Sequence, residues 1–222
     1  MVLKYEKEAK DILRILDQYV PKILDGVDCI NWLHKYSTQK KQDEWAGFFF
    51  EDFSFSILKH ILGGTKGPRI IPGKRFDYQL EFVWDFKLEA ENGSNGKKTK
   101  EIILNDITAT NRVLEFEDGI GYIIAKAKFQ YDNNGKLRRW RDKKENRKRQ
   151  HTKSRVLKRR GTITDVFAVF IKNKDELDKA IKSGWISIFN QGENVGGASR
   201  KPKYQIKLDK IPKKYLIQIE NS

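Results

Sequence analysis

The segment Asp85-Phe86-Lys87 places an acid and an amine two residues apart, within a run of alternating apolar and polar side chains. On a β-strand, residues two apart project from the same face, about 6.5–7 Å from each other. A carboxylate fixed there can hold a divalent cation, and the neighbouring ammonium can support an attacking water or the charge that grows on a phosphate. The spacing of Asp85 and Lys87 therefore indicates phosphodiester hydrolysis as a candidate chemistry.

A site of this kind needs a second carboxylate, and the upstream choice is narrow because no acidic residue lies between Asp52 and Asp77. If residues 77–85 formed one straight strand, the carboxylates of Asp77 and Asp85 would lie about 26 Å apart. The hypothesis that they share a cation therefore requires the backbone to reverse between them. Residues 78–84 contain no Gly, Pro or Asn to indicate a turn.

Asp77, seven intervening residues and then Asp85-Phe86-Lys87 form a pattern that resembles the active-site motif of the PD-(D/E)XK nuclease superfamily. The members that it resembles most are type II restriction endonucleases, whose active-site strand often reads hydrophobic–Asp–hydrophobic–Lys, as it does here. Phe76 stands where the superfamily often has proline. The resemblance implies that Asp77 and Asp85 bind Mg²⁺ and that Lys87 positions water or stabilises charge.

Many members of this superfamily also carry a glutamate on a helix upstream of the sheet. The apolar segment at 42–62 has helical spacing and offers Glu51, with Glu44 two turns earlier on the same face as the substitute. The resemblance covers roughly residues 40–130, and it implies that the helix acid assists a metal ion or a water.

The periodicity of apolar residues predicts the elements that position these side chains. Helices are expected over residues 4–19, 27–35, 42–62, 106–116 and 175–182. Strands are expected over residues 76–89, 122–129, 164–171, 204–208 and 215–219. The strand at 164–171 is the most apolar and is expected near the centre of the sheet. This order predicts an α/β or α+β domain: a mixed central β-sheet flanked by helices, a restriction-endonuclease-like core with a basic insertion.

The length of 222 residues fits a single nuclease domain over 1–222. Its expected parts are an N-terminal helical part at 1–40, a catalytic core at 42–130 and 162–189, a basic insertion at 136–160, and a C-terminal loop with strands at 190–222. Cys29 is the only cysteine, which excludes a disulfide within the chain and a cysteine-rich zinc site. Without an apolar run of membrane-spanning length or a signal-like N-terminus, the chain is expected to be cytoplasmic, with no membrane partner.

The charge indicates a polyanionic partner, because 45 Lys and Arg residues outnumber 30 Asp and Glu residues and give a formal net charge of +15. Residues 136–160 contain 14 of these basic residues. They are interpreted either as a solvated helix or hairpin or as a DNA-clamping insertion, and the loop at 190–201 as a recognition loop or a plain connection. The candidate DNA contacts are Arg138, Arg139, Arg141, Lys143, Lys144, Arg147, Arg200 and Lys201.

The resulting hypothesis is a Mg²⁺-dependent type II restriction endonuclease that cuts double-stranded DNA at a short site. Two-fold symmetry of the site favours a homodimer, and a cognate DNA methyltransferase is expected in the same cell without a stable complex. Two alternatives remain open. One is a structure-specific repair or junction nuclease. The other is a non-catalytic basic module that binds nucleic acid and carries the acids on its surface.

Overall fold

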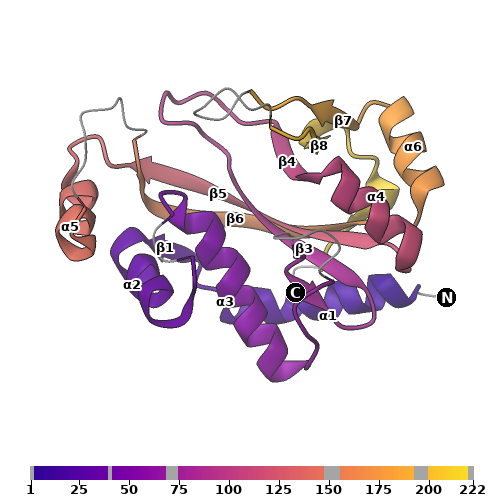
Figure 1. Cartoon of the computed structure of the whole chain (residues 1–222), viewed down its shortest axis with the longest axis horizontal. Coiled ribbons are helices and arrows are strands. Elements are labelled where there is room, and N and C mark those ends of the chain that lie inside the picture. Colours follow the sequence, from indigo (N-terminus) through magenta and orange to yellow (C-terminus); the bar gives the residue numbers. More distant parts are fainter. Residues whose placement is uncertain (1–2, 40–41, 69–74, 148–155, 193–199, 220–222) are drawn as a thin grey trace.

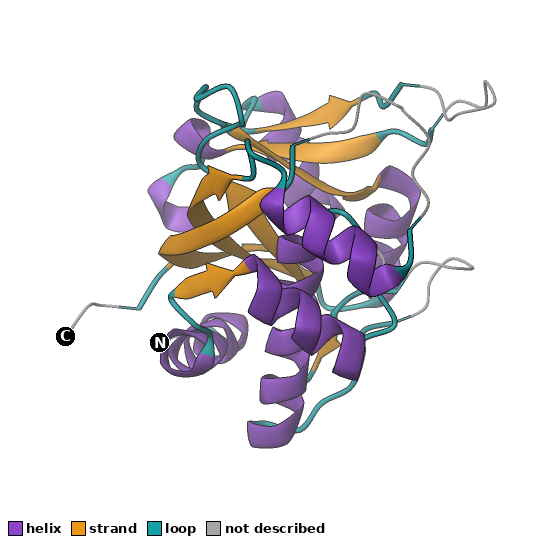
Figure 2. Ribbon diagram, turned by 90° about the vertical axis from the view of Figure 1, so that its left-hand side faces the viewer, coloured by secondary structure: helices purple, strands orange, loops and turns teal. Residues whose placement is uncertain are grey.

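The computed structural model describes residues 3–39, 42–68, 75–147, 156–192 and 200–219. A mixed sheet runs through the middle of the molecule, with helices on both sides and a second, smaller sheet above it (Figure 1). The turned view shows the smaller sheet at the top of the molecule and helices packed beside the strands (Figure 2). This arrangement confirms the α/β (α+β) class that the sequence predicts.

The main sheet has the strand order β1-β6-β5-β3-β2, and β9 pairs with β6 outside this path. Its strands are β1 (Ile23–Asp25), β2 (Tyr78–Gln79), β3 (Val83–Ala90), β5 (Ile120–Tyr131), β6 (Lys158–Ile171) and β9 (Leu216–Ile217). Only β3 and β5 are parallel, and the other pairs are antiparallel. β5 and β6 are longer than expected, and β6 lies in the interior of the sheet as its apolar sequence predicts.

Three helices cover one face of this sheet: α1 (Lys4–Tyr19), α2 (Gly26–Tyr36) and α3 (Trp45–Ile61). The other face is covered by α4 (Ile107–Phe116), α6 (Lys174–Lys182) and an antiparallel sheet of β4 (Glu101–Asp106), β8 (Lys203–Lys207) and β7 (Ile186–Phe189). Each face therefore has its own apolar core, so the interior strands are buried on both sides.

The strand expected over residues 76–89 differs from the observed structure. The alternating run at 76–89 is not one strand, because β2 and β3 are separated by a reversal at residues 80–82 and pair antiparallel. The basic insertion contains a helix, α5 (Lys136–Glu145), which packs beside α2 and α3. The C-terminal part also contains two short 3-10 helices, Leu208–Lys210 and Lys213–Tyr215.

Side chains cap the N-termini of three described helices: Asp25 caps α2, Asp106 caps α4 and Asn173 caps α6. The Asp106 carboxylate accepts hydrogen bonds from the backbone N–H groups of Thr108 and Ala109, which starts α4 directly after β4. Asn105 is therefore held at the end of a strand, next to a helix N-terminus. Within the described part of the chain, no helix is both long and apolar enough to cross a membrane.

Candidate active site

The chain reverses direction between Asp77 and Asp85. Tyr78 in β2 lies opposite Trp84 in β3, so the residue before β2 is brought back beside the strand that carries Asp85. The backbone N–H of Phe86 donates a hydrogen bond of 2.8 Å to Oδ2 of Asp77. The two acids that the sequence places eight positions apart therefore lie beside each other, as the metal hypothesis requires.

All four predicted site residues line one pocket of about 360 Å³. They come from the middle of α3, from the segment before β2 and from β3, and the second core supplies the opposite wall through β4, α4 and β8. The lining residues are Phe48, Glu51, Arg75, Phe76, Asp77, Asp85, Lys87, Asn105, Asp106, Ala109 and Lys203. Three separate segments of the chain thus converge on one site.

The structure distinguishes the two candidates for the helix acid. Glu51 lies in the middle of α3 and lines the pocket with Asp77 and Asp85. Glu44 precedes the helix, does not line the pocket, and forms an ion pair of 2.9 Å with Lys158. Of the two candidates, Glu51 is therefore the one that lines the pocket.

The carboxylate of Asp85 is held on both of its oxygens. Its Oδ2 forms an ion pair with the Lys87 ammonium, and its Oδ1 accepts a hydrogen bond of 2.9 Å from the amide of Asn105. Asp85 is only 3% exposed, so it has little access to water to replace these partners. The hydrogen bond from Asn105 fixes the orientation of the carboxylate towards the pocket.

The acids and the lysine of this pocket perturb one another. Burial raises the pKa of Glu51 to about 7; Lys87 opposes this shift, and Asp85 adds to it. Burial, together with the charges of Asp85 and Glu51, raises the pKa of Asp77 well above its usual value. Burial disfavours the charged form of Lys87, but the three carboxylates outweigh it and raise the pKa of the ammonium. Among these four groups three acids outnumber one amine, and a cation, bound protons or the basic side chains of Arg75 and Lys203, which also line the pocket, can balance them.

The donor atoms of the pocket fit a hard divalent cation such as Mg²⁺. Asp77 and Asp85 offer carboxylate oxygens in a buried, negatively charged setting, and Mg²⁺ commonly binds through one or two carboxylates with waters and substrate phosphates completing the shell. Among the described residues, no group of three or more His, Cys, Asp and Glu side chains has the arrangement of a metal site. Asp77 and Asp85 are the protein ligands that the motif predicts, and both line the pocket.

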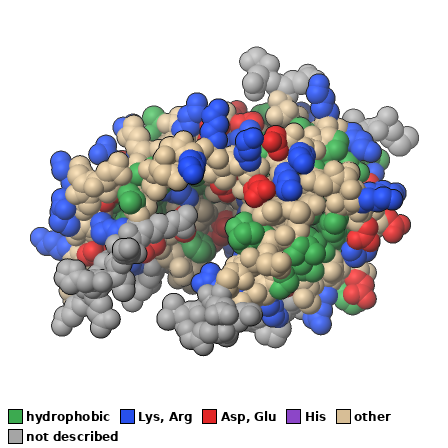
Figure 3. All heavy atoms as spheres, turned by 90° about the horizontal axis from the view of Figure 1, so that it is seen from above, with side chains coloured by type: hydrophobic (Ala, Val, Ile, Leu, Met, Phe, Trp, Pro, Cys, Tyr) green, Lys and Arg blue, Asp and Glu red, His purple; other side chains and the backbone are tan. Residues whose placement is uncertain are grey.

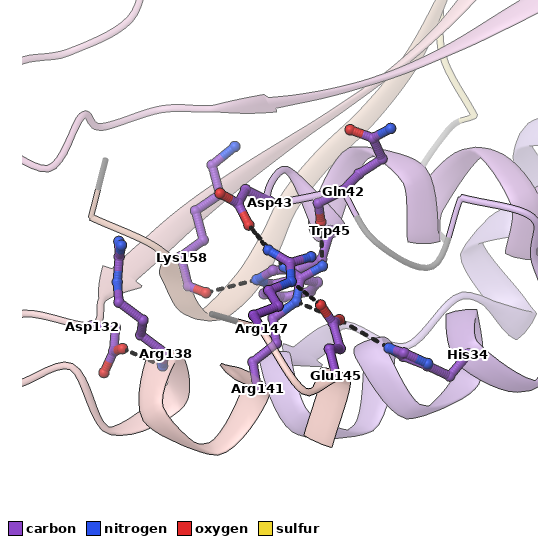
Figure 4. Close-up of polar contacts among 10 residues, drawn as sticks. All are labelled: His34, Gln42, Asp43, Trp45, Asp132, Arg138, Arg141, Glu145, Arg147 and Lys158. Carbon is purple, nitrogen blue, oxygen red and sulfur yellow. Dashed lines mark hydrogen bonds and ion pairs between the residues drawn. The ribbon is translucent and has the colours of Figure 1, made fainter. Parts of the chain in front are cut away.

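The prediction that Arg141 contacts DNA is wrong. Arg141 is 1% exposed, and its guanidinium forms an ion pair of 2.8 Å with Glu145 and donates a hydrogen bond of 2.7 Å to the carbonyl of Gln42 (Figure 4). Arg147 belongs to the same cluster, since it pairs with Glu145 and, at 2.8 Å, with Asp43. These arginines fasten α5 to the segment before α3; Arg147 is partly exposed, and its contact with DNA stays a prediction, as does that of Arg138.

The remaining basic candidates differ in their surroundings. Arg138 is partly buried, and the amine of Lys144 donates a hydrogen bond of 2.5 Å to Asn31 although the residue is exposed. Residues 193–199 of the expected recognition loop lie outside the described residues. Lys and Arg side chains are spread over the face shown in Figure 3, across its middle as well as at its edges. The exposed candidates, which stay predictions, are Arg139, Lys143, Lys144, Arg200 and Lys201.

Asn105, Arg75 and Lys203 line the pocket but were not among the site residues expected from the sequence. Asn105 lies on β4, whose six residues follow a stretch rich in Lys and Gly that gives no strand signal. The one available signal was Asp106, a capping residue at the start of a predicted helix, which marks the preceding position as a strand end.

The site therefore combines two aspartates, a lysine and a glutamate, presented by an interior strand and by the segments packed against it. No protein-family model matches this chain, and no curated protein and no solved structure shows significant similarity to it. The arrangement of the side chains can bind a divalent cation, hold a phosphate through the ammonium, and accept a proton on a carboxylate.

Proposed function

We propose that this chain is a Mg²⁺-dependent type II restriction endonuclease, which hydrolyses phosphodiester bonds of double-stranded DNA at a short specific site. The observation that supports this proposal is the convergence of Glu51, Asp77, Asp85 and Lys87 in one pocket. These are the positions that match the PD-(D/E)XK motif. Asp77 and Asp85 lie together although residues 78–84 contain no Gly, Pro or Asn that would favour a local turn.

Each protein group has a distinct task in the proposed reaction. Asp77 and Asp85 would hold Mg²⁺, which when bound acts as a Lewis acid and lowers the pKa of a coordinated water. The Lys87 ammonium hydrogen-bonds to a phosphate oxygen or to the attacking water and stabilises the growing negative charge. The pKa of Glu51, raised to about 7 by burial, allows this carboxylate to accept a proton near neutral pH.

The net charge of +15 supports a polyanionic substrate, since each neutralised phosphate releases counterions from the DNA. Cleavage of both strands at a two-fold symmetric site is best served by a homodimer with one pocket per strand. A restriction enzyme in the cytoplasm also requires a cognate methyltransferase that protects the host DNA. These partners belong to the proposal.

The proposal is tested by digesting phage DNA and a mixed plasmid with and without Mg²⁺, and reading the products on a gel. Discrete bands that require Mg²⁺ are expected. Lys87→Ala and Asp85→Asn should each reduce the cleavage rate by about 100-fold or more, which is the typical effect of losing one group that stabilises the transition state. The matched controls are Lys182→Ala and Asp118→Asn, because both residues are exposed and neither lines the pocket.

The outcomes separate three functions. Cleavage that depends on Mg²⁺ but yields no defined fragments would replace the restriction enzyme by a structure-specific repair or junction nuclease. Binding of DNA without any cleavage, unchanged in Lys87→Ala and Asp85→Asn, would identify a basic nucleic-acid-binding module and refute both nuclease functions.

A further inference from the structure

The reversal at residues 80–82 has no Gly, Pro or Asn to form it, and β2 contributes only two residues to its pairing with β3. A side chain from α1 supplies the missing contacts. Glu8 Oε2 accepts a hydrogen bond of 3.2 Å from the backbone N–H of Glu81, and its Oε1 accepts one of 3.3 Å from the N–H of Phe82. The carboxylate thus takes the place of the turn partners that local sequence does not provide.

The same carboxylate also holds the side chain next to Asp85. Glu8 Oε1 accepts a hydrogen bond of 2.7 Å from the indole Nε1 of Trp84. On its other side, the ring of Trp84 lies so close to Gly121 of β5 that a Cβ built at that glycine would be 2.1 Å from it. The indole is therefore fixed from two directions, and the backbone at Asp85 is fixed with it.

Glu8 is itself deeply placed for a charged residue, with only 8% of its surface exposed. A buried carboxylate is costly unless donors replace its hydration, and here three N–H groups do so. Burial raises the pKa of Glu8 above its usual value, whereas the N–H donors favour the charged form. Because burying the Glu8 carboxylate is costly and three N–H groups bind it, we expect this carboxylate to fix the conformation of the reversal and of Trp84.

We propose that Glu8 is a positioning residue of the candidate active site: it fixes the reversal and the indole of Trp84 so that Asp77 is held beside Asp85. This inference rests on the proposed function, because the pair that is positioned is the proposed cation-binding pair. Loss of Glu8 loosens the short β2 pairing, whereas the bridge between Thr65 and Gln79 on the far side of β2 keeps the segment attached. The consequence is a weakened cation site in a protein that still folds.

The test measures Mn²⁺ binding to the full-length chain by calorimetry in the absence of DNA. Glu8→Ala is expected to weaken Mn²⁺ binding by about 10–100-fold, the usual range for losing a group that orients a metal ligand. Glu8→Gln keeps an acceptor oxygen and should restore part of the affinity. Lys4→Ala is the matched control, because Lys4 also joins α1 to the reversal, through an exposed ion pair with Glu81.

Cleavage assays add a readout that a general loss of stability would not produce. If Glu8 positions the cation site, raising the Mg²⁺ concentration restores cleavage by Glu8→Ala towards the wild-type rate. Circular dichroism and thermal melting establish the folded fraction, and Glu8→Gln carries the comparison if Glu8→Ala does not fold.

Two failures can be told apart. Suppose that the wild-type protein cuts DNA and binds Mn²⁺, and that Glu8→Ala and Glu8→Gln bind Mn²⁺ as tightly as the wild type does. This result would overturn the role of Glu8 and leave the proposed function intact. A wild-type protein that neither binds Mn²⁺ nor cuts DNA would overturn the proposed function and this inference with it.

Discussion

At the scale of single residues, the burial of Glu51 and Asp77 close to Asp85 sets the protonation of the pocket. Two of these acids have a raised pKa, for which burial is the largest cause. In the absence of a cation, the folded chain therefore retains protons that the unfolded chain has already released. The cost of charging these buried acids favours cation binding, and it also makes the stability of the fold depend on pH.

Glu51→Gln removes one of the three acids, and its effect on stability should depend on pH. Burial raises the pKa of Glu51 to about 7, above the unfolded value near 4.5. In that window the folded wild type binds more protons than the unfolded chain, so the free energy of unfolding falls as the pH rises from about 4.5 to 7. Without a divalent cation, Glu51→Gln should therefore be more stable than the wild type at pH 8, and this advantage should shrink towards pH 5.

Urea denaturation at pH 5 and pH 8, with EDTA present, measures this difference. Glu115→Gln is the matched control, because Glu115 is an exposed acid on α4 and should change stability equally little at both pH values. A difference between Glu51→Gln and the wild type that is independent of pH would contradict the raised pKa.

At the scale of elements, α5 shows how a basic segment can serve the fold. Its guanidiniums meet acids that come from its own last turn and from the segment before α3, and His34 of α2 adds a contact of 2.9 Å to Glu145. The side chains of Arg141 and Glu145 are each 1% exposed. Arg147 and His34 also contact Glu145, so these buried charges compensate one another as a cluster.

Arg141→Ala should therefore destabilise the protein strongly. The substitution removes one partner of the Glu145 carboxylate, which keeps Arg147 and His34, and losing a hydrogen bond to a charged group typically costs about 1.5–3 kcal/mol. Arg139→Ala, on the exposed side of the same helix, should change the free energy of unfolding by less than about 0.5 kcal/mol. Urea denaturation measures both, and equal small effects would show that the cluster does not fasten α5.

At the scale of the whole molecule, the net charge of +15 sets an expectation for the affinity for DNA. A protein that makes about six phosphate contacts loses roughly 1,000-fold in affinity between 50 and 200 mM salt, because released counterions rebind the DNA. We expect a loss of at least this size for duplex DNA, measured by fluorescence anisotropy with Ca²⁺ in place of Mg²⁺. An affinity that is insensitive to salt would argue against a substrate bound through its phosphates.

Much of the fold follows from local patterns. The helix and strand periods along the chain predict α1 to α4, α6, β5 and β8 to within a few residues, because each has one clear apolar face or an unbroken apolar run. The patterns in the sequence did not predict β4 and β7. β4 has six residues and β7 has four, and each contains exposed positions, so the alternation of apolar and polar residues is too short to recognise. Residue types and spacing predicted Glu51, Asp77, Asp85 and Lys87 as site residues. They did not predict that Asn105 and Lys203 also line the pocket.

By itself, the sequence determined the acid and amine on β3, the charge of the chain and the mixed α/β class, because residue type and period are local properties. Only the tertiary structure decided that the chain reverses before β3 and that Arg141 is buried. Both outcomes depend on partners far away in the sequence: Glu8 lies 74 positions from Phe82, and Gln42 lies 99 positions from Arg141. The turn before β3 contains no typical turn residue, and Arg141 is buried although arginine usually faces solvent. Both features can be recognised only when the distant hydrogen-bond partners are known, because these partners satisfy the buried polar groups.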